Sequence, residues 1–461
     1  MKRVTIIGAG LGGLSTGALL AKSGFRVTIL EQHSIVGGCA TTFKRGDFTC
    51  EVGLHKMDGV YTNALVVDTF KKLDVYKHIE FIKPNEFFSI RLKDSEFIMP
   101  NGIKEAKDAL IAKFPNEKRG IELYFKYISK IAKSYEILQS NNIFKTPFTL
   151  LTILKFKSKS VSEVLEKIIT DKELFTILNA NVQYYNDSPK TLSFLLHSIA
   201  QYSYFSGGGY FIKGGSSTLS NYLAKVIKEN GGAVITKANV TAANKNSVEY
   251  MYKKQKHILL SDIIISNISQ EQTYKLFNIE YKEHKELANS LLTIYLGFSK
   301  NLKTIYGKRA YSNFIDNFAF VDYSQIDSHL SPKDKSFGAI CFIDSIKNWE
   351  SLDKSSYRAK KDAILQEYIK KLEKHYPNIT DYIEYAEVGT PKTVKRYIKT
   401  PNGTAYGYKP TPKQFFKIPK VQSKKIKNLY FVGQFVIAGG FSPAIISGAM
   451  CAKEISHTYN L

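Results

Sequence analysis

The sequence predicts an α/β protein in which a three-layer domain around a mostly parallel sheet is interleaved with an α+β domain. Residues 4–31 read as a short apolar strand, a glycine-rich turn, a helix and a second strand. Glycine-rich segments return at residues 207–217 and 433–440, so the chain comes back to the first unit twice. The stretches between them are poor in glycine and read as mixed strands and amphipathic helices, which predicts the second domain.

The turn between the first strand and the first helix has the sequence Gly-Ala-Gly-Leu-Gly-Gly at residues 8–13. Gly8 permits the tight turn, Gly10 lets backbone N–H groups approach a pyrophosphate, and Gly13 lets the helix pack close to the sheet. The helix over residues 14–23 directs its positive N-terminal end at the phosphates. This order of elements predicts a Rossmann-like domain that binds a dinucleotide.

An acidic residue and a second glycine turn complete the predicted nucleotide site. Glu31 closes the strand over residues 26–30, about twenty residues beyond the glycines, where a carboxylate accepts hydrogen bonds from ribose hydroxyls. Residues 37–42, with the sequence Gly-Gly-Cys-Ala-Thr-Thr, add backbone donors and hydroxyls toward the pyrophosphate. This second approach favours FAD over a nicotinamide cofactor.

Length and composition exclude several classes of protein. A chain of 461 residues with 44% hydrophobic and 23% charged residues is globular and long enough for two or three domains. The formal net charge is +24, but the lysines are spread along the chain without a nucleic-acid-binding motif, so we expect no nucleic-acid partner. The four cysteines have no CxxC spacing and a chain of this length needs no disulfide, which predicts a reducing cytoplasm and no metal site.

Two apolar segments imitate export or membrane signals. The N-terminal apolar run follows basic residues but carries the first glycine turn, so we expect no export. Residues 429–452 contain no charged residue and are long enough to span a bilayer, yet glycines and Pro443 interrupt them. We predict a buried strand, turn and helix there.

The predicted domains are discontinuous in the chain. The FAD-binding domain comprises residues 1–75, 205–270 and 385–461. The substrate-binding domain comprises residues 76–204 and 271–384.

One helix of the second domain has two interpretations. Residues 146–159 combine Leu150, Leu151, Ile153 and Leu154 with three lysines, as expected of a helix that lies at a lipid interface. A core-facing helix with solvated lysines has the same pattern. Aromatic residues at 182–185 and 194–204 suit a pocket for an elongated apolar substrate, and they equally suit an ordinary core.

Long segments of the chain resemble the phytoene desaturase, carotenoid isomerase and retinol saturase superfamily of FAD-dependent oxidoreductases, most closely its retinol saturase branch. They are residues 37–55, 211–240, 389–407 and 428–450, together with the first glycine turn. The resemblance implies that Val240 meets the adenine through its backbone, and that Gly433 and residues 439–444 lie against the ribityl chain and the isoalloxazine. Cys39 and Gln434 depart from many relatives and look like the saturase type.

The predicted cofactor-binding residues are therefore Gly8, Gly10, Gly12, Gly13, Glu31, Gly37, Gly38, Cys39, Ala40, Thr41, Val240, Gly433, Gln434, Gly440, Phe441, Ser442 and Ala444. The resemblance implies saturation, desaturation or cis–trans isomerisation of a lipophilic polyene such as a carotenoid or retinoid. Two alternatives stay open. One is an amine-oxidase-like enzyme that acts on a small polar substrate, and the other is a redox-inert basic flavoprotein that binds membrane or nucleic acid.

The catalytic acid or base is not marked by a known motif, since no Ser-His-Asp or metal-ligand constellation is present. His55, Glu51 and His197 are predicted as proton carriers. The pattern does not identify the electron donor or acceptor. We expect a cytoplasmic protein that binds peripherally to the inner, anionic face of a membrane.

Overall fold

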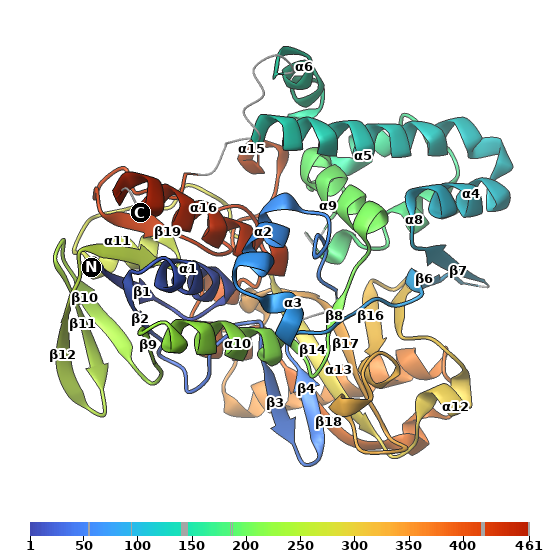
Figure 1. The fold of residues 1–461 in the computed structure, drawn as a ribbon. Helices are drawn as coiled ribbons and strands as arrows, with labels where there is room; N and C mark the ends of the chain where they lie inside the picture. Colours follow the sequence, from blue (N-terminus) through green and yellow to red (C-terminus); the bar gives the residue numbers. More distant parts are fainter. Residues whose placement is uncertain are drawn as a thin grey trace.

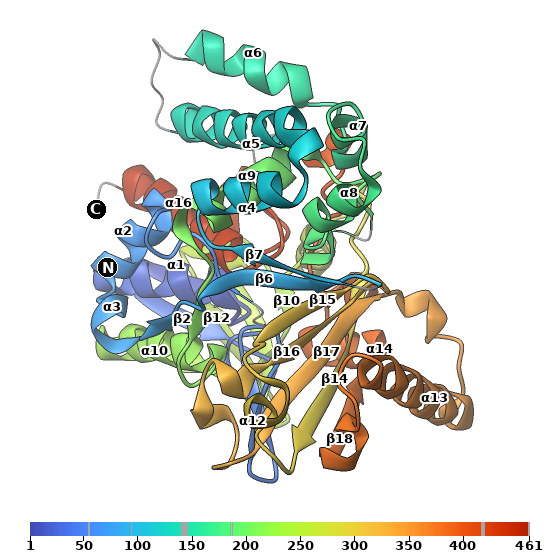
Figure 2. The ribbon, with the colours of Figure 1, turned by 90° about the vertical axis from the view of Figure 1, so that its right-hand side faces the viewer.

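Two large sheets and a layer of helices dominate the computed structural model (Figures 1 and 2). The structure describes residues 1–53, 56–93, 95–139, 146–184, 186, 188–415 and 420–459. A five-stranded parallel sheet lies beside both chain termini, a seven-stranded mixed sheet lies below right in Figure 1, and the helical layer covers the top.

The parallel sheet has the strand order β19-β13-β1-β2-β9, and every neighbouring pair is parallel. Its strands are β1 (Arg3–Ile7), β2 (Arg26–Leu30), β9 (Ala233–Ile235), β13 (Ile263–Ser266) and β19 (Leu429–Phe431). The continuous apolar run Ile263-Ile264-Ile265 is fully buried, as expected of a parallel strand that is covered on both faces. The carboxyl ends of all five strands meet at one edge of the sheet.

Helices cover one face of this sheet and a small antiparallel sheet covers the other. On the first face α1 (Leu11–Lys22) packs between α10 (Ser216–Glu229) and α16 (Phe441–Tyr459) (Figure 1). The second face packs against β10 (Asn239–Ala243), β11 (Ser247–Tyr252), β12 (Gln255–Leu260) and α11 (Gln270–Leu276). The predicted three-layer α/β fold is confirmed, with a small sheet as its third layer.

The mixed sheet has the order β18-β14-β17-β16-β15-β6-β7, in which β15 and β6 are parallel and the other neighbours are antiparallel. Its strands are β6 (Glu86–Arg91), β7 (Glu96–Pro100), β14 (Ser290–Phe298), β15 (Tyr311–Phe314), β16 (Phe318–Asp322), β17 (Ser336–Asp344) and β18 (Ile383–Gly389). On β14, Leu292 and Ile294 belong to a core with Trp349 and α13 (Lys354–Glu373). The alternate residues therefore point to the opposite face, toward the helical layer and the cavity described below.

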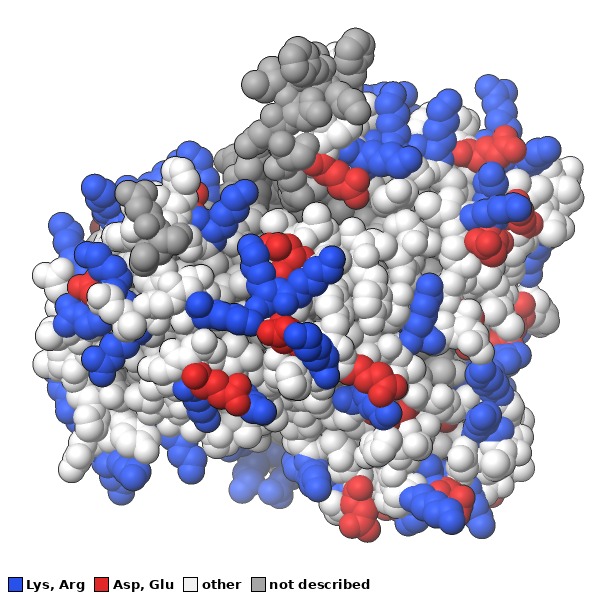
Figure 3. Space-filling model, viewed as in Figure 1, with Lys and Arg blue, Asp and Glu red and all other residues white. Residues whose placement is uncertain are grey.

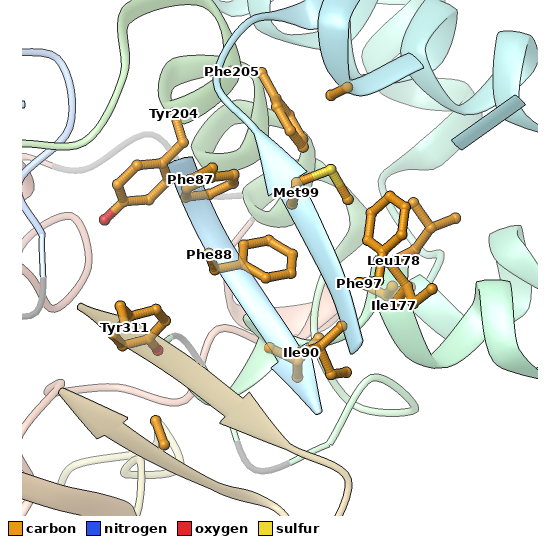
Figure 4. Close-up of a cluster of buried hydrophobic side chains, with 14 of the residues drawn as sticks. Phe87, Phe88, Ile90, Phe97, Met99, Ile177, Leu178, Tyr204, Phe205 and Tyr311 are labelled. Carbon is orange, nitrogen blue, oxygen red and sulfur yellow. The ribbon is translucent and has the colours of Figure 1, made fainter. Parts of the chain in front are cut away.

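The helical layer packs on that opposite face. It contains α4 (Ile103–Lys113), α5 (Lys118–Gln139), α6 (Thr146–Phe156), α7 (Val161–Leu165), α8 (Lys172–Leu178) and α9 (Phe194–Gly207). On α5, Ile121, Tyr124 and Ile128 recur at helical spacing and are buried in a core shared with β6 and β7. Figure 4 shows part of this core, with Phe87 and Phe88 of β6 beside Met99 of β7.

Shorter elements connect these layers. They are β3 (Thr42–Arg45), β4 (Phe48–Glu51), α2 (Ala64–Lys72), α3 (Val75–His78), β5 (Phe81–Ile82), β8 (Phe211–Ile212), α12 (Leu302–Tyr306), α14 (Pro391–Ile398) and α15 (Pro412–Phe415). Within the described ranges, no helix is both long enough and apolar enough to cross a membrane. Residues 429–452 form β19, a turn and most of α16, in agreement with the prediction for that segment.

Strand β18 straddles the predicted domain boundary at residue 385 and pairs along β14. The β3–β4 hairpin also reaches this sheet, because Arg45 forms an ion pair with Glu387 at 2.7 Å and the ring of Phe48 packs against Gly297. The hairpin and most of β18 come from parts of the chain assigned to the FAD-binding domain. The division into two domains stays a prediction, and in space the two parts interlock along β18 and this hairpin.

Candidate functional site

The carboxyl end of β1 opens into a large cavity. Gly8 has φ +95°, which side chains rarely adopt, and a Cβ on Gly13 would lie 2.3 Å from Gly8 O. Gly8, Gly10 and Gly12 line the cavity, while Gly13 lies in the strand–helix contact behind them. Among the described residues, no side chain forms a capping hydrogen bond at the N-terminus of α1. Its first N–H groups therefore remain available to a phosphate.

Glu31 follows β2 and lines the same cavity. Its Oε2 accepts a hydrogen bond from Ala9 N at 2.8 Å, and its Oε1 accepts one from His33 N at 2.8 Å. Burial raises the pKa of this carboxyl, and the two backbone N–H groups oppose that rise. The oxygens retain lone pairs that can accept hydrogen bonds from ribose hydroxyls.

The second glycine turn lies directly against the first. Gly37 N donates to Ala9 O at 2.7 Å, and a Cβ on Gly37 would lie 2.1 Å from Ala40 O. Burial raises the pKa of the Cys39 thiol to about 11, so this thiol is neutral at neutral pH. The residues of this turn that line the cavity are Gly37, Gly38, Cys39, Ala40 and Thr41.

The C-terminal segment supplies another wall. Gly433 has φ +86° and its N–H donates to Ser447 Oγ at 2.7 Å. Ser442 does not line the cavity, because its hydroxyl donates to Asp58 O at 2.6 Å and fastens the first turn of α16. The predicted residues on this wall that do line the cavity are Gly433, Gln434, Gly440, Phe441 and Ala444, and Val240 lines it from β10.

Asn267 is absent from the predicted set, yet its side chain lies among the glycine turns. A Cβ on Gly10 would lie 2.6 Å from Asn267 Nδ2, and Cβ atoms on Gly12 and Gly433 would lie 2.8 and 2.3 Å from Asn267 Oδ1. Asn267 follows β13 directly and lines the cavity. A polar residue immediately after a buried strand was the sequence signal for this position.

The cavity has a volume of about 1540 Å³ and extends from the glycine turns to Leu291, Thr293 and Tyr295 of β14. Small-molecule pockets usually measure about 300–1,000 Å³, so this cavity has room for both a cofactor and a substrate. Glycines that leave no space for a Cβ, an open helix N-terminus and a carboxylate placed for ribose together fit the predicted FAD.

Cations outnumber anions around the cavity. The lining cations are Arg45, Lys275, Lys354, Lys361, Lys392, Arg396 and Lys399. The three lining carboxylates have partners already: Glu31 accepts from two backbone N–H groups, Glu387 pairs with Arg45, and Asp353 accepts from Ser356 N at 2.8 Å. The excess positive charge suits the phosphates of a dinucleotide.

Two of the predicted proton carriers lie away from the lining, and His55 lies outside the described residues. Buried Glu51 accepts hydrogen bonds from Ser216 N at 2.7 Å and Ser216 Oγ at 2.6 Å, which fixes the start of α10. His197 is fully buried with its Nε2 3.1 Å from Tyr124 Oη. Burial lowers the pKa of His197 to about 3, so its ring is neutral at physiological pH. A catalytic role for the three residues stays a prediction.

Lys56 is a buried amine that the sequence did not single out. Its Nζ donates to Phe87 O and to Glu86 O, two carbonyls at an irregularity in the β6–β7 pairing. The same atom lies 5.1 Å from the centre of the Tyr311 ring. Burial lowers the pKa of Lys56 to about 7. Among the described residues, no group of three or more His, Cys, Asp or Glu side chains could hold a metal ion.

Known proteins resemble this chain over almost its whole length. All-trans-retinol 13,14-reductase from Danio rerio is 24% identical, with 98% of this chain and 85% of that protein covered. Prolycopene isomerase 1, chloroplastic, from an Oncidium hybrid cultivar is 27% identical, with 98% and 83% covered. These relatives confirm the resemblance to the retinol saturase and carotenoid isomerase superfamily.

Solved structures share the fold. An oxidoreductase from Methanosarcina mazei superimposes with a TM-score of 0.69 at 15% identity, covering 98% of this chain and all of that one. Putrescine oxidase superimposes with a TM-score of 0.68 at 11% identity, covering 99% of each chain. The model of the family described as flavin-containing amine oxidoreductase matches residues 11–456. The chain therefore belongs to the flavin-containing amine oxidoreductases and is a FAD-dependent oxidoreductase.

Proposed function

We propose that this enzyme saturates, desaturates or isomerises a carbon–carbon double bond of a lipophilic polyene. The observation that carries the proposal is the apolar and aromatic lining of the cavity beyond the glycine turns, which includes Phe43, Leu291, Tyr295, Val388, Tyr406 and Phe441. An elongated conjugated chain fits such a lining. Relatives named as a retinol reductase and a prolycopene isomerase support a polyene as the substrate.

The chain's own residues orient the reactants and exclude water. When bound at the glycine turns, FAD would supply hydride exchange, and a conjugated polyene would delocalise the charge that such an exchange creates. Burial raises the pKa of Tyr295 and of Tyr406 far above the usual phenol value, so both hydroxyls stay neutral in the cavity wall. Neutral hydroxyls and ring faces hold a polyene without introducing a fixed charge beside it.

The redox balance of the flavin distinguishes the three reactions. The enzyme is mixed with polyenes under anaerobic conditions, once with its FAD reduced and once with its FAD oxidised. Saturation should reoxidise reduced FAD, desaturation should bleach oxidised FAD, and isomerisation should change the polyene without a net change in the flavin; mass spectrometry and chromatography identify the products. Hydrogen peroxide formed from amines, with every polyene left unchanged, would refute the proposal in favour of an amine oxidase.

We further propose that α6 docks the enzyme on an anionic membrane. Of the four predicted apolar side chains, Leu150, Leu151 and Leu154 are 44, 65 and 41% exposed, while Ile153 is buried. The exposed leucines lie on the outermost helix in Figure 1, which packs on α5. An exposed apolar strip on a helix can insert at the interface and collect an apolar substrate there.

Lysines surround this strip. Lys155 and Lys157 are exposed beside the leucines, and α5 exposes Lys126, Lys130 and Lys133 at helical spacing. Figure 3 shows basic side chains along the edge that α5 forms, within a face on which Lys and Arg are otherwise widely spread. Their charge complements anionic lipid headgroups. A cytoplasmic location stays a prediction.

A further inference from the structure

A second, small cavity adjoins the large one on the substrate side. It has a volume of about 20 Å³ and shares the lining residues Leu291 and Tyr406 with the large cavity. Its other walls come from β15, β16, β17 and the segment 180–184 that follows α8. A chain that fills the apolar part of the large cavity can therefore end here.

Polar side chains form a hydrogen-bonded series in the wall of this cavity. Tyr311 Oη donates to Asn313 Oδ1 at 3.1 Å, and Asn313 Nδ2 donates to Asn181 Oδ1 at 3.2 Å. The series ends at Asn181 Nδ2, which has no hydrogen-bond partner within the described part of the chain although Asn181 is only 2% exposed. Buried amides in folded proteins are almost always paired, so this donor points to an acceptor supplied from outside the chain.

The packing around Asn181 holds this donor in place. Ile177 and Leu178, at the end of α8, are buried against Phe97 of β7 (Figure 4). Tyr311 projects from the neighbouring strand in the same view, and its ring stacks with Tyr184 at 5.9 Å. Both ends of the hydrogen-bonded series are therefore fixed by the core.

The size and charge of the small cavity restrict the acceptor. A cavity needs about 10–15 Å³ to hold one water, so this one takes a single oxygen-sized group. Among the described residues that line it, none is charged, and a carboxylate would be buried there without a counter-ion. A neutral hydroxyl or carbonyl oxygen satisfies both conditions.

We propose that Asn181 binds an oxygen atom at one end of the polyene, so that the substrate is a polyene alcohol, aldehyde or ketone and not a hydrocarbon. The inference rests on the proposed function and names its substrate class. A hydrocarbon end in the same position would leave the Asn181 amide unpaired and should lower kcat/KM by about tenfold or more.

The test compares matched polyenes on the holoenzyme. The first pair is all-trans-retinol and the same molecule without its hydroxyl, and the second is lycopene with and without one terminal hydroxyl. The native enzyme should prefer the oxygen-bearing member of the pair that it converts, mainly through a lower KM. In the Asn181→Leu enzyme, the ratio of kcat/KM for the oxygen-bearing member to kcat/KM for the oxygen-free member should be close to one.

Asn186→Leu is the matched control. Asn186 is also buried in this region, but its Nδ2 donates to Thr191 Oγ1 at 2.8 Å and it lines neither cavity. The Asn186→Leu enzyme should keep the native preference for the oxygen-bearing polyene. FAD absorbance and the melting temperature check folding, and Asn181→Ala serves where the leucine variant does not fold.

Two results would overturn the inference while the proposed function stands: equal conversion of both members of a pair by the native enzyme, or an undiminished preference in the Asn181 variants. Conversion of neither pair in either flavin state would instead count against the proposed function itself.

Discussion

The backbone of Gly10 and the side chain of Asn267 lie so close together that a Cβ on Gly10 would be 2.6 Å from Asn267 Nδ2. Gly10 itself has φ −74°, which any residue can adopt. An added side chain at this position therefore pushes aside only the end of the Asn267 side chain. It occupies the space in front of α1 and leaves the backbone of the turn unchanged. This makes Gly10 the position at which cofactor binding can be tested separately from folding.

Gly10→Val should fold and lose FAD, because the valine side chain occupies the approach to the pyrophosphate. The measurement is the flavin absorbance per mole of purified protein, with circular dichroism to confirm the fold. Gly24→Asn is the control, since Gly24 lies at the far end of α1, an added Cβ there meets no described atom within contact distance, and asparagine tolerates a positive φ such as the +87° of Gly24 better than other side chains do. A Gly10→Val protein with full flavin occupancy would place the nucleotide elsewhere.

Glu51→Gln should destabilise the protein while the flavin half-reactions stay at native rates. The carboxylate accepts the N–H and the hydroxyl of Ser216, and an amide cannot accept both with the same strength. The loss should be about 1–3 kcal/mol in the free energy of unfolding, measured by chemical denaturation. Native stability together with a large drop in the rate of proton-coupled flavin reduction would instead identify Glu51 as a catalytic acid or base.

Lys56 should make the stability of the protein depend on pH. Its pKa of about 7 in the folded state is below the value of 10.5 for an unperturbed lysine, so unfolding takes up a proton between these pH values. The free energy of unfolding of the native protein, relative to Lys56→Met, should therefore increase with pH by up to about 1.4 kcal/mol per unit between about pH 7 and 10.

Denaturation of both proteins at several pH values measures this difference. The loss of the hydrogen bonds to Glu86 O and Phe87 O changes the free energy of unfolding of the variant by a constant amount. It does not change how the difference between the two proteins depends on pH. A difference that is flat over the window would mean that Lys56 keeps its proton in the folded protein.

Replacing Leu150, Leu151 and Leu154 together with serine should abolish flotation with anionic liposomes at low salt. The three side chains form the exposed strip of α6, and high salt should weaken the attachment of the native protein because lysines contribute to it. Ile153→Ala is the matched control, since Ile153 is buried and should cost stability without affecting flotation. A native protein that remains in the soluble fraction would exclude the membrane proposal.

The sequence predicted the parts of the site that depend on neighbouring residues. The glycine turns and Glu31 follow strands at fixed spacings, and the backbone there determines both local shape and hydrogen bonding. Asn267 also follows a buried strand, but that signal does not identify its contacts, because they arise only when β13 pairs with β1 and brings the asparagine to Gly10 and Gly433. The same holds for Asn181, because its amide is hydrogen-bonded to Asn313, which lies on a strand far along the chain.

The assigned proton carriers show the opposite difficulty. A histidine or glutamate in a promising segment has the right chemistry, but whether it faces the cavity depends on long-range packing. Glu51 accepts a hydrogen bond from the first residue of α10, and His197 is hydrogen-bonded to Tyr124. In α6 the sequence shows four apolar residues but not which of them are exposed. The packing of α6 on α5 decides this, because it buries Ile153 and leaves the three leucines exposed.

The strand order of the parallel sheet also bears on how the protein is made. The first unit, β1–α1–β2, is synthesised well before β19 and before α16, the helix that covers α1, because most of the described chain lies between them. At translation rates of about 5–20 residues per second, the apolar surface of α1 waits on the order of tens of seconds for α16. The FAD site needs Gly433 as a wall, so it cannot form completely before the segment that follows β19 has been synthesised.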